Sequence, residues 1–202
     1  MRENAKDPQK HAERMKRKRE AMARRIERAD QDRGVLIVLT GPGKGKSSSA
    51  FGMIARTLGH GGSAHVMQFI KGKRETGETL FFRELLEIPW HVMGEGFTWD
   101  TADRERDTAA AQAAWATARG WLTEEGPDLV VLDELCIALR YEYLAVDEVL
   151  TDLAARPAWQ HVVITGRNAP RPLTEAADTV SHVEAIKHAF AAGVRAQPGV
   201  EW

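Results

Sequence analysis

The chain has 202 residues, of which 43% are hydrophobic, and its formal net charge is −1. This size suits one domain with a buried core, and the near-neutral charge gives the whole chain no electrostatic attraction to nucleic acid. A single cysteine excludes an internal disulfide and suits a reducing compartment. No apolar run is long enough to span a membrane, and the charged N-terminus lacks the apolar core of a secretory signal. We therefore expect a cytoplasmic protein that crosses no membrane.

Residues 1–33 differ in composition from the rest of the chain. Between Met1 and Arg28 there are 11 Lys or Arg against 5 Asp or Glu. The stretch favours helix, but its few apolar residues give such a helix little surface to bury. We predict a basic N-terminal arm, helical or partly disordered, before one domain at residues 34–202. The arm could be solvated, could bind nucleic acid, or could pack over an anionic ligand or a partner subunit.

After Arg33, strands and helices alternate along the chain. The sequence predicts strands at 34–39, 63–70, 88–93, 128–134, 161–166 and 178–184, and helices at 46–58, 78–86, 102–124 and 147–155. Continuous apolar strands separated by helices are typical of a mostly parallel sheet that is covered on both faces. The expected fold class is therefore α/β.

A glycine-rich loop, "GPGKGKS", follows the first predicted strand and opens the first helix. Its glycines, Gly41, Gly43 and Gly45, would let backbone N–H groups approach a phosphate closely, and the helix N-terminus adds its dipole. Lys46 would reach phosphate oxygens, Ser47 would offer a hydroxyl to Mg²⁺, and Lys44 supplies a second cation. The wider predicted nucleotide-binding set includes Pro42 and Ser48. The usual spacing is G-x-x-x-x-G-K-[ST], and this loop is one residue shorter, because Thr40 stands where the first glycine belongs.

The strand "LVVLDE" ends in two carboxylates, Asp133 and Glu134. Ligands of open α/β sheets bind at the carboxyl ends of the strands, and carboxylates there can hold Mg²⁺ directly or through water. The alternative role for such an Asp is to cap the following helix. Arg167 ends a later strand, where it could contact phosphate or cap.

These motifs predict binding of a magnesium nucleotide, and they name no acceptor. An ordinary kinase or ATPase acting on the γ-phosphate would carry the same pair of motifs, and so would a nucleic-acid-binding RecA-type module that uses the basic arm. The first rival predicts ADP as a product, and the second predicts DNA or RNA binding that weakens steeply with salt.

Six segments in order make the chain similar to one family, the ATP:corrinoid adenosyltransferases of cobalamin biosynthesis and salvage. They are "GPGKGKSSSAFG", "VMQFIKG", "GEGFTWDT", "LVVLDEL" with "YEYL", "VVITGRNAP" and "EAIKHAFAAGVRAQPGVEW". The resemblance runs from about Arg33 to Trp202. It implies a RecA-like P-loop fold and transfer of the 5′-deoxyadenosyl group of ATP to a Co(I) corrinoid, with release of tripolyphosphate.

The resemblance also implies roles that residue patterns alone do not give. ATP would lie along the loop in the reverse sense to an ordinary ATPase, with Lys44 and Lys46 stabilising the leaving tripolyphosphate. Phe97 and Trp99 of "GFTW" would lie at the corrin, where apolar side chains displace the lower axial ligand of Co(II) and ease its reduction. The resemblance agrees with the motifs that Ser47, Asp133 and Glu134 would hold a metal ion, here Mg²⁺ or Mn²⁺.

The partners implied are ATP, a reduced corrinoid, a second copy of the chain in a homodimer and a reduced flavoprotein as electron donor, with no nucleic acid. The chain departs from the family pattern after Arg167. Family members commonly carry a His-Arg pair there, whereas this chain keeps Arg171 but has Pro170 before it. We therefore assign no role to Arg171.

Overall fold

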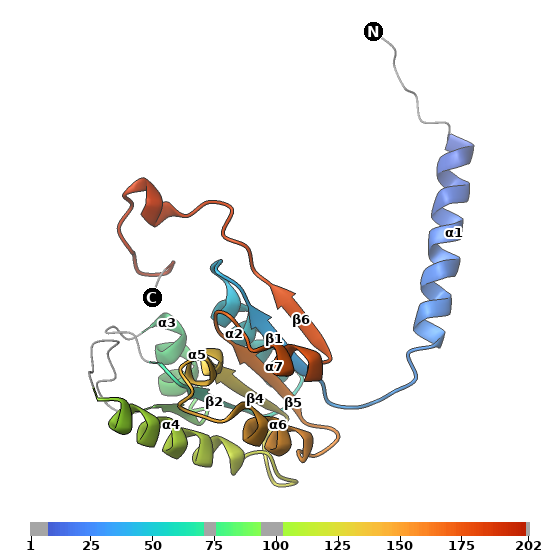
Figure 1. Ribbon diagram of the computed structural model, residues 1–202. Coiled ribbons are helices and arrows are strands. Elements are labelled where there is room, and N and C mark those ends of the chain that lie inside the picture. Colours follow the sequence, from blue (N-terminus) through green and yellow to red (C-terminus); the bar gives the residue numbers. More distant parts are fainter. Residues whose placement is uncertain (1–7, 71–75, 94–102, 201–202) are drawn as a thin grey trace. The chain divides into compact units, whose positions relative to one another are not determined.

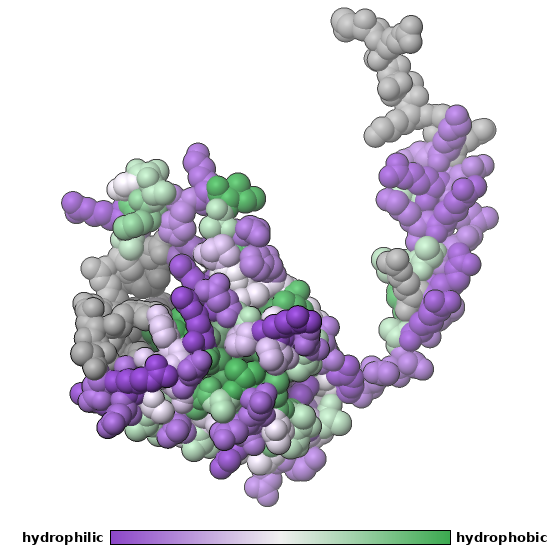
Figure 2. Space-filling view, in the orientation of Figure 1, coloured by the Kyte–Doolittle hydropathy of each residue, from purple (hydrophilic) through white to green (hydrophobic). Residues whose placement is uncertain are grey.

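A computed structural model describes residues 8–70, 76–93 and 103–200 of the chain. The chain forms two compact units, Met1–Arg33 and Gly34–Trp202, which are described separately. The first unit contains the helix α1 (Pro8–Glu27). Its surface is mostly hydrophilic (Figure 2), and its larger apolar side chains, Met15, Met22 and Ile26, are exposed.

The second unit is built on a sheet of six parallel strands in the order β3-β2-β4-β5-β1-β6. The strands are β1 (Leu36–Thr40), β2 (Ala64–Gln68), β3 (Trp90–Val92), β4 (Leu129–Asp133), β5 (His161–Thr165) and β6 (Thr179–His182). Because all the pairs are parallel, the carboxyl ends of the strands share one edge of the sheet (Figure 1). All six predicted strands are present, each shorter than its apolar run.

Successive strand residues pack into two separate cores on opposite faces of the sheet. In β4, Val130 and Leu132 belong to one core, and Leu129 and Val131 to the other. This alternation follows from the two-residue period of a strand. It confirms that helices cover both faces, and it explains why the central strands are apolar throughout.

Helices from different parts of the chain form these two covering layers. The helices α2 (Lys46–Gly59) and η1 (Leu80–Leu85) pack on one face through Ala50, Ile54 and Phe82. The other face is covered by α4 (Arg104–Arg119), α5 (Leu135–Arg140), α6 (Val146–Ala154) and α7 (Arg171–Ala176). Two further short helices are α3 (Gly77–Thr79) and the 3₁₀ helix η2 (Ala189–Ala192).

Some predicted helix boundaries are wrong, and the helices α5 and α7 and the 3₁₀ helix η2 were not predicted. The predicted helix 102–124 begins at Arg104, because Asp103 caps it by accepting a 3.0 Å hydrogen bond from the N–H of Arg106. The predicted helix 78–86 is one α turn followed by a π-helix. The helix α5 was missed because Leu135–Leu139 are all buried, so this stretch lacks the polar face that marks a helix. The helix α7 was missed because it is a single short segment that opens with proline.

Within the described residues, no helix is both long enough and apolar enough to cross a membrane.

Candidate active site

The glycine loop after β1 has a backbone that its glycines make possible. Gly41 and Gly45 have φ values of 107° and 110°, a region that residues with a Cβ rarely adopt. A Cβ on Gly43 would lie 2.4 Å from the carbonyl oxygen of Glu184, and the N–H of Gly43 donates a 2.7 Å hydrogen bond to the carbonyl of Val183. The loop is therefore held against the segment that follows β6.

The helix α2 starts directly after this loop and carries the basic and hydroxyl groups of the motif. Lys46 is only 6% exposed, and its Nζ donates a 2.8 Å hydrogen bond to the carbonyl oxygen of Gly43. Lys44, in contrast, is exposed, and Ser47 is half-buried in the first turn of the helix. The loop thus offers one anchored cation and one exposed cation.

The carboxylate that ends β4 and the carboxylate of the next residue are held differently. Asp133 is 4% exposed; its Oδ1 accepts a 2.7 Å hydrogen bond from the hydroxyl of Thr165, and its Oδ2 accepts a 3.0 Å bond from the amide of Gln68. Glu134 has a left-handed backbone with φ 58°, and its Oε2 is buried without a hydrogen-bond partner among the described residues. The capping alternative for Asp133 is wrong, because Glu134 is the cap residue of α5 and forms no side-chain cap bond.

The charges at this edge of the sheet influence one another. Burial raises the pKa of Glu134, and the negative charge of Asp133 raises it further, while Lys46 and Arg167 oppose the shift. Burial lowers the pKa of Lys46, against the attraction of Glu134. Keeping Glu134 and Lys46 charged therefore costs free energy in the protein without ligand. A cation beside Glu134 and an anion beside Lys46 would reduce that cost, so the site favours binding of both.

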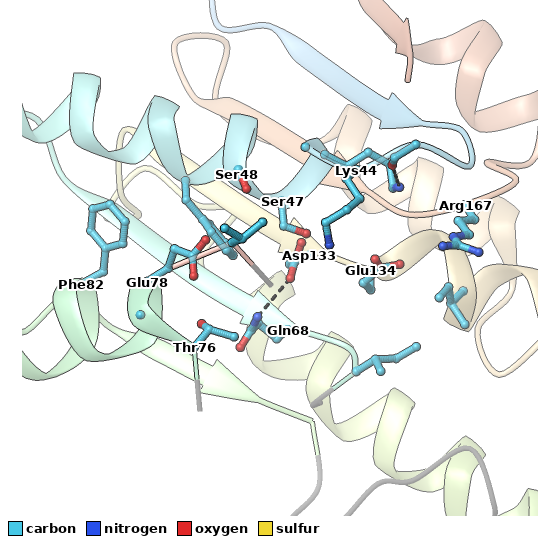
Figure 3. A pocket seen from close by; sticks show the side chains of 18 of the residues that line it. Lys44, Ser47, Ser48, Gln68, Thr76, Glu78, Phe82, Asp133, Glu134 and Arg167 are labelled. Carbon is cyan, nitrogen blue, oxygen red and sulfur yellow. Dashed lines mark hydrogen bonds between the residues drawn. The ribbon is translucent and has the colours of Figure 1, made fainter. Parts of the chain in front are cut away.

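A cleft of about 940 Å³ opens over these groups. Most of the predicted set lines it, and Figure 3 shows the carboxylate of Asp133 between the Ser47 hydroxyl and the Gln68 amide. The predicted residues in its wall are Gly43, Lys44, Gly45, Lys46, Ser47, Ser48, Asp133, Glu134 and Arg167. The remaining walls include apolar side chains, with Phe81 and Phe82 from η1 and Ile137 and Tyr141 from α5 and the turn after it.

Two predicted residues that the structure describes, Gly41 and Pro42, do not line the cleft. Gly41 is buried, and a Cβ there would lie 2.5 Å from the carbonyl oxygen of Val183, so it shapes the turn. Pro42 is exposed beside it. Phe97 and Trp99 lie outside the residues that the structure describes.

Sequence reasoning missed several residues of the site. Gln68 and Thr165 lie inside the predicted strands 63–70 and 161–166 and end the observed strands β2 and β5. With these ends placed correctly, the rule that ligands bind at carboxyl ends could have found them. Glu78 and Phe82 come from a segment whose π-helical turn has no pattern that sequence analysis recognises. Arg171 forms an ion pair with Glu175 at 2.7 Å and does not line the cleft.

The described residues suit a magnesium ion that is shared with a phosphate. Among residues 8–70, 76–93 and 103–200, no group of three or more His, Cys, Asp or Glu could enclose a metal ion. Mg²⁺ rarely uses such a cage and is usually held by one or two carboxylates together with substrate phosphates. Oε2 of Glu134, buried and without a hydrogen-bond partner in the described part of the chain, is a carboxylate ligand of that kind, and the Ser47 hydroxyl beside it in the cleft is a second oxygen ligand.

Comparison with known proteins places this site in a family. Residues 32–202 match the family described as "ATP:corrinoid adenosyltransferase BtuR/CobO/CobP". The chain belongs to this family. A corrinoid adenosyltransferase of Pseudomonas aeruginosa is 56% identical over the full length of both chains. Corrinoid adenosyltransferase CobA of Salmonella typhimurium is 44% identical and covers 96% of this chain and 98% of its own.

Family membership makes the protein an ATP:corrinoid adenosyltransferase, a transferase that adenosylates corrinoids. The fold agrees with a solved structure of low sequence similarity. Flagellar accessory protein FlaH from Methanocaldococcus jannaschii is 13% identical, with a TM-score of 0.50 over 75% of this chain and 71% of that one. The adenosyltransferase therefore has the predicted RecA-like P-loop fold.

Proposed function

We propose that this chain transfers the 5′-deoxyadenosyl group of ATP to the Co(I) centre of a reduced corrinoid and releases tripolyphosphate. One observation carries the proposal: a single cleft of about 940 Å³ joins the shortened phosphate loop to an apolar wall. A nucleotide on the loop and a large, partly apolar substrate could meet in that cleft. The chemistry is assigned to residues 34–202, and residues 1–33 form a separate arm.

In the proposed reaction a Co–C bond forms at C5′, and the bond between C5′ and the triphosphate oxygen breaks. The triphosphate leaves with the electron pair of that bond, and no proton has to move. The reaction therefore requires no activated side-chain nucleophile and no general base. In agreement with this, Cys136 beside the site is buried, and burial raises the pKa of its thiol to about 12.

The tasks left to the protein are alignment and stabilisation of the leaving group. Lys46, Lys44 and the loop N–H groups would bind the triphosphate, and Arg167 lies close enough to influence Lys46 electrostatically. Glu134 and Ser47, supported by Asp133, would hold Mg²⁺ or Mn²⁺, which when bound neutralises phosphate charge. Phosphate binding by Lys46 requires that it exchange its bond to the carbonyl of Gly43 for one to the ligand.

Two further residues complete the proposal on the corrinoid side. Phe97 and Trp99 would press against the lower face of the corrin and exclude the axial ligand of Co(II). Loss of that ligand makes reduction to Co(I) easier. A reduced flavoprotein would supply the electron, and the enzyme would act as a homodimer in the reducing cytoplasm, without nucleic acid.

The decisive experiment mixes the protein with MgATP and chemically reduced cob(I)alamin, anaerobically and in the dark. We expect a photolabile adenosylated corrinoid in the cobalt spectrum and tripolyphosphate as the phosphate product. A parallel reaction without corrinoid measures background hydrolysis of ATP. Adenosylated corrinoid accompanied by pyrophosphate and phosphate in place of tripolyphosphate would reject the proposed leaving group, and ADP without any cobalt–carbon product would reject the transfer.

A further inference from the structure

A row of side-chain hydrogen bonds crosses four neighbouring strands, from the first residue of β3 to the carboxyl ends of β2, β4 and β5. The indole N–H of Trp90 on β3 donates to Oε1 of Gln68 on β2 at 2.9 Å. The amide Nε2 of Gln68 donates to Oδ2 of Asp133 on β4 at 3.0 Å, and the hydroxyl of Thr165 on β5 donates to Oδ1 of Asp133 at 2.7 Å. We call these four residues the edge relay; Figure 3 shows its central bond.

The chemistry of the two outer groups fixes the orientation of the Gln68 amide between them. An indole N–H can only donate, and an ionised carboxylate can only accept. Only one orientation of the amide satisfies both Trp90 and Asp133, with the oxygen toward the indole and the nitrogen toward the carboxylate. The amide of Gln68 thus accepts from the indole on one side and donates to the carboxylate on the other.

The first member of the edge relay is itself immobilised by the wall of the cleft. Trp90 is 7% exposed, and its ring centroid lies 5.0 Å from that of Phe51 and 6.4 Å from that of Phe82. Both phenylalanines line the cleft. The edge relay therefore connects the aromatic wall contributed by α2 and η1 to the carboxylates at the end of β4.

The last member of the edge relay acts on the neighbouring residue of the chain. The hydroxyl of Thr165 also accepts a 2.9 Å hydrogen bond from the N–H of Glu134. That bond holds the left-handed backbone of Glu134, with φ 58°. Because the same hydroxyl donates to Asp133, the position of the Asp133 carboxylate and the position of the Glu134 backbone are coupled.

From these contacts we infer that Gln68 is a positioning residue of the reaction, which orients Asp133 and, through Thr165, aims the Glu134 carboxylate at the metal–triphosphate. The inference rests on the proposed function, in which these carboxylates serve the metal. Residues that orient metal ligands typically change metal affinity about 10- to 100-fold when they are replaced. Gln68 lines the cleft, and in this scheme it acts on ATP through Asp133 and the metal. Its effect must therefore appear in metal-dependent binding and not in the binding of metal-free ATP.

The test compares ATP binding with Mg²⁺ and with EDTA, by calorimetry, in the wild type and in Gln68→Met. Methionine keeps the length of the side chain and removes both hydrogen bonds. We expect the dissociation constant of MgATP to rise about 10-fold, while that of metal-free ATP changes less than about 2-fold. Electron paramagnetic resonance of Mn²⁺ in the presence of ATP should show the same loss of bound metal.

Gln160→Met provides the matched control, because Gln160 is a fully buried glutamine away from the cleft-lining residues. Its amide nitrogen donates to the backbone carbonyls of Trp121 and Pro127. Gln160→Met should lower the melting temperature without changing the ratio of the dissociation constants for MgATP and for metal-free ATP. Trp90→Phe keeps an aromatic ring in place and removes only the first donor of the edge relay. It should shift the ratio in the same direction as Gln68→Met by a smaller factor, and it serves as the test if Gln68→Met does not fold.

Two results would overturn the inference about Gln68, and only the second of them would also reject the metal site of the proposed function. If Gln68→Met and Trp90→Phe lower the melting temperature as Gln160→Met does but leave the ratio at its wild-type value, Gln68 is a structural residue and the proposed function stands. If the wild type itself binds ATP equally with Mg²⁺ and with EDTA, the metal site of the proposed function fails together with the inference.

Discussion

Asp133 and Glu134 are adjacent in the chain, yet their carboxylates are held in opposite ways. Both oxygens of Asp133 accept hydrogen bonds from the protein, whereas Oε2 of Glu134 is buried and has no hydrogen-bond partner among the described residues. A satisfied carboxylate contributes to stability, and a buried, unsatisfied one costs stability until a ligand compensates it. The two residues should therefore respond differently to removal of their charge.

For Glu134→Gln we expect turnover to fall by about 100-fold or more and the melting temperature to stay the same or rise. The folded state raises the pKa of Glu134 above its usual value, so its ionised form destabilises the fold at neutral pH and a neutral amide removes that cost. Turnover from chemically reduced corrinoid and thermal unfolding without ligand are the two measurements. A clearly lower melting temperature would contradict the assignment.

Asp133→Asn is the matched variant, with the opposite expectation for stability. The asparagine would present an N–H to either the Thr165 hydroxyl or the Gln68 amide, where a donor already points. One buried donor would then be unsatisfied, at a cost of about 1–3 kcal/mol. Chemical denaturation should show this loss, and an unchanged free energy of unfolding would mean that these two hydrogen bonds contribute little.

Lys46→Ala should abolish turnover by weakening ATP binding, and Lys44→Ala should have a smaller effect. Lys46 is 6% exposed and anchored to the loop, so its charge acts on the triphosphate in a region that excludes water. Lys44 is exposed, and solvent screens its charge. Binding titrations with MgATP rank the two variants. Near-normal activity of Lys46→Ala would remove the glycine loop from the mechanism.

The sequence predicts the strands and the glycine loop well because both depend on local signals. The run from Leu129 to Leu132 is apolar throughout, with two β-branched valines at its centre, and it forms a fully buried strand. The loop is recognised by Gly43, Gly45 and Lys46, because the backbone freedom of glycine and the charge of lysine are properties of the residues themselves. Gln68, however, reaches the site only because β2 lies beside β4. That adjacency of strands distant in sequence is a property of the whole sheet, and no local pattern encodes it.

Trp99→Ala should slow the reaction from Co(II) far more than the reaction from chemically reduced Co(I). The proposed role of Trp99 is to exclude the lower axial ligand, which matters for reduction and not for the later attack on C5′. Trp159→Ala is a suitable control, because Trp159 is 39% exposed and its indole bonds Glu124. It should leave the ratio of the two rates unchanged. Equal losses from both starting states in Trp99→Ala would reject the lower-face role.

The thiol of Cys136 should resist alkylation in the folded protein, although it lies close to the nucleotide loop. The residue is fully buried, and burial raises the pKa of its thiol to about 12. Almost no thiolate, the reactive form, is present at neutral pH. Iodoacetamide labelling followed by mass spectrometry should detect modification only in denaturant. Rapid labelling of the native protein would show that the helix α5 opens and exposes Cys136.

His65 should make the fold less stable as the pH falls below about 6.5. Its Nδ1 is buried without a hydrogen-bond partner among the described residues, and its ring packs edge-on against Trp121 at 5.2 Å. Burial lowers the pKa of His65 from 6.5, and the nearby His91 lowers it further. The unfolded chain therefore binds a proton at a higher pH than the folded chain does, so stability is complete above the unfolded pKa and is lost below it.

Urea unfolding of the wild type and of His65→Gln between about pH 5 and pH 8 isolates this contribution. Other histidines and the carboxylates titrate in both proteins, so only the difference between the two curves reports on His65. We expect that difference to be constant above about pH 7 and to move in favour of His65→Gln as the pH falls, because glutamine cannot acquire the charge. A difference that stays constant down to about pH 5 would mean that the folded protein accommodates protonated His65 as easily as water does.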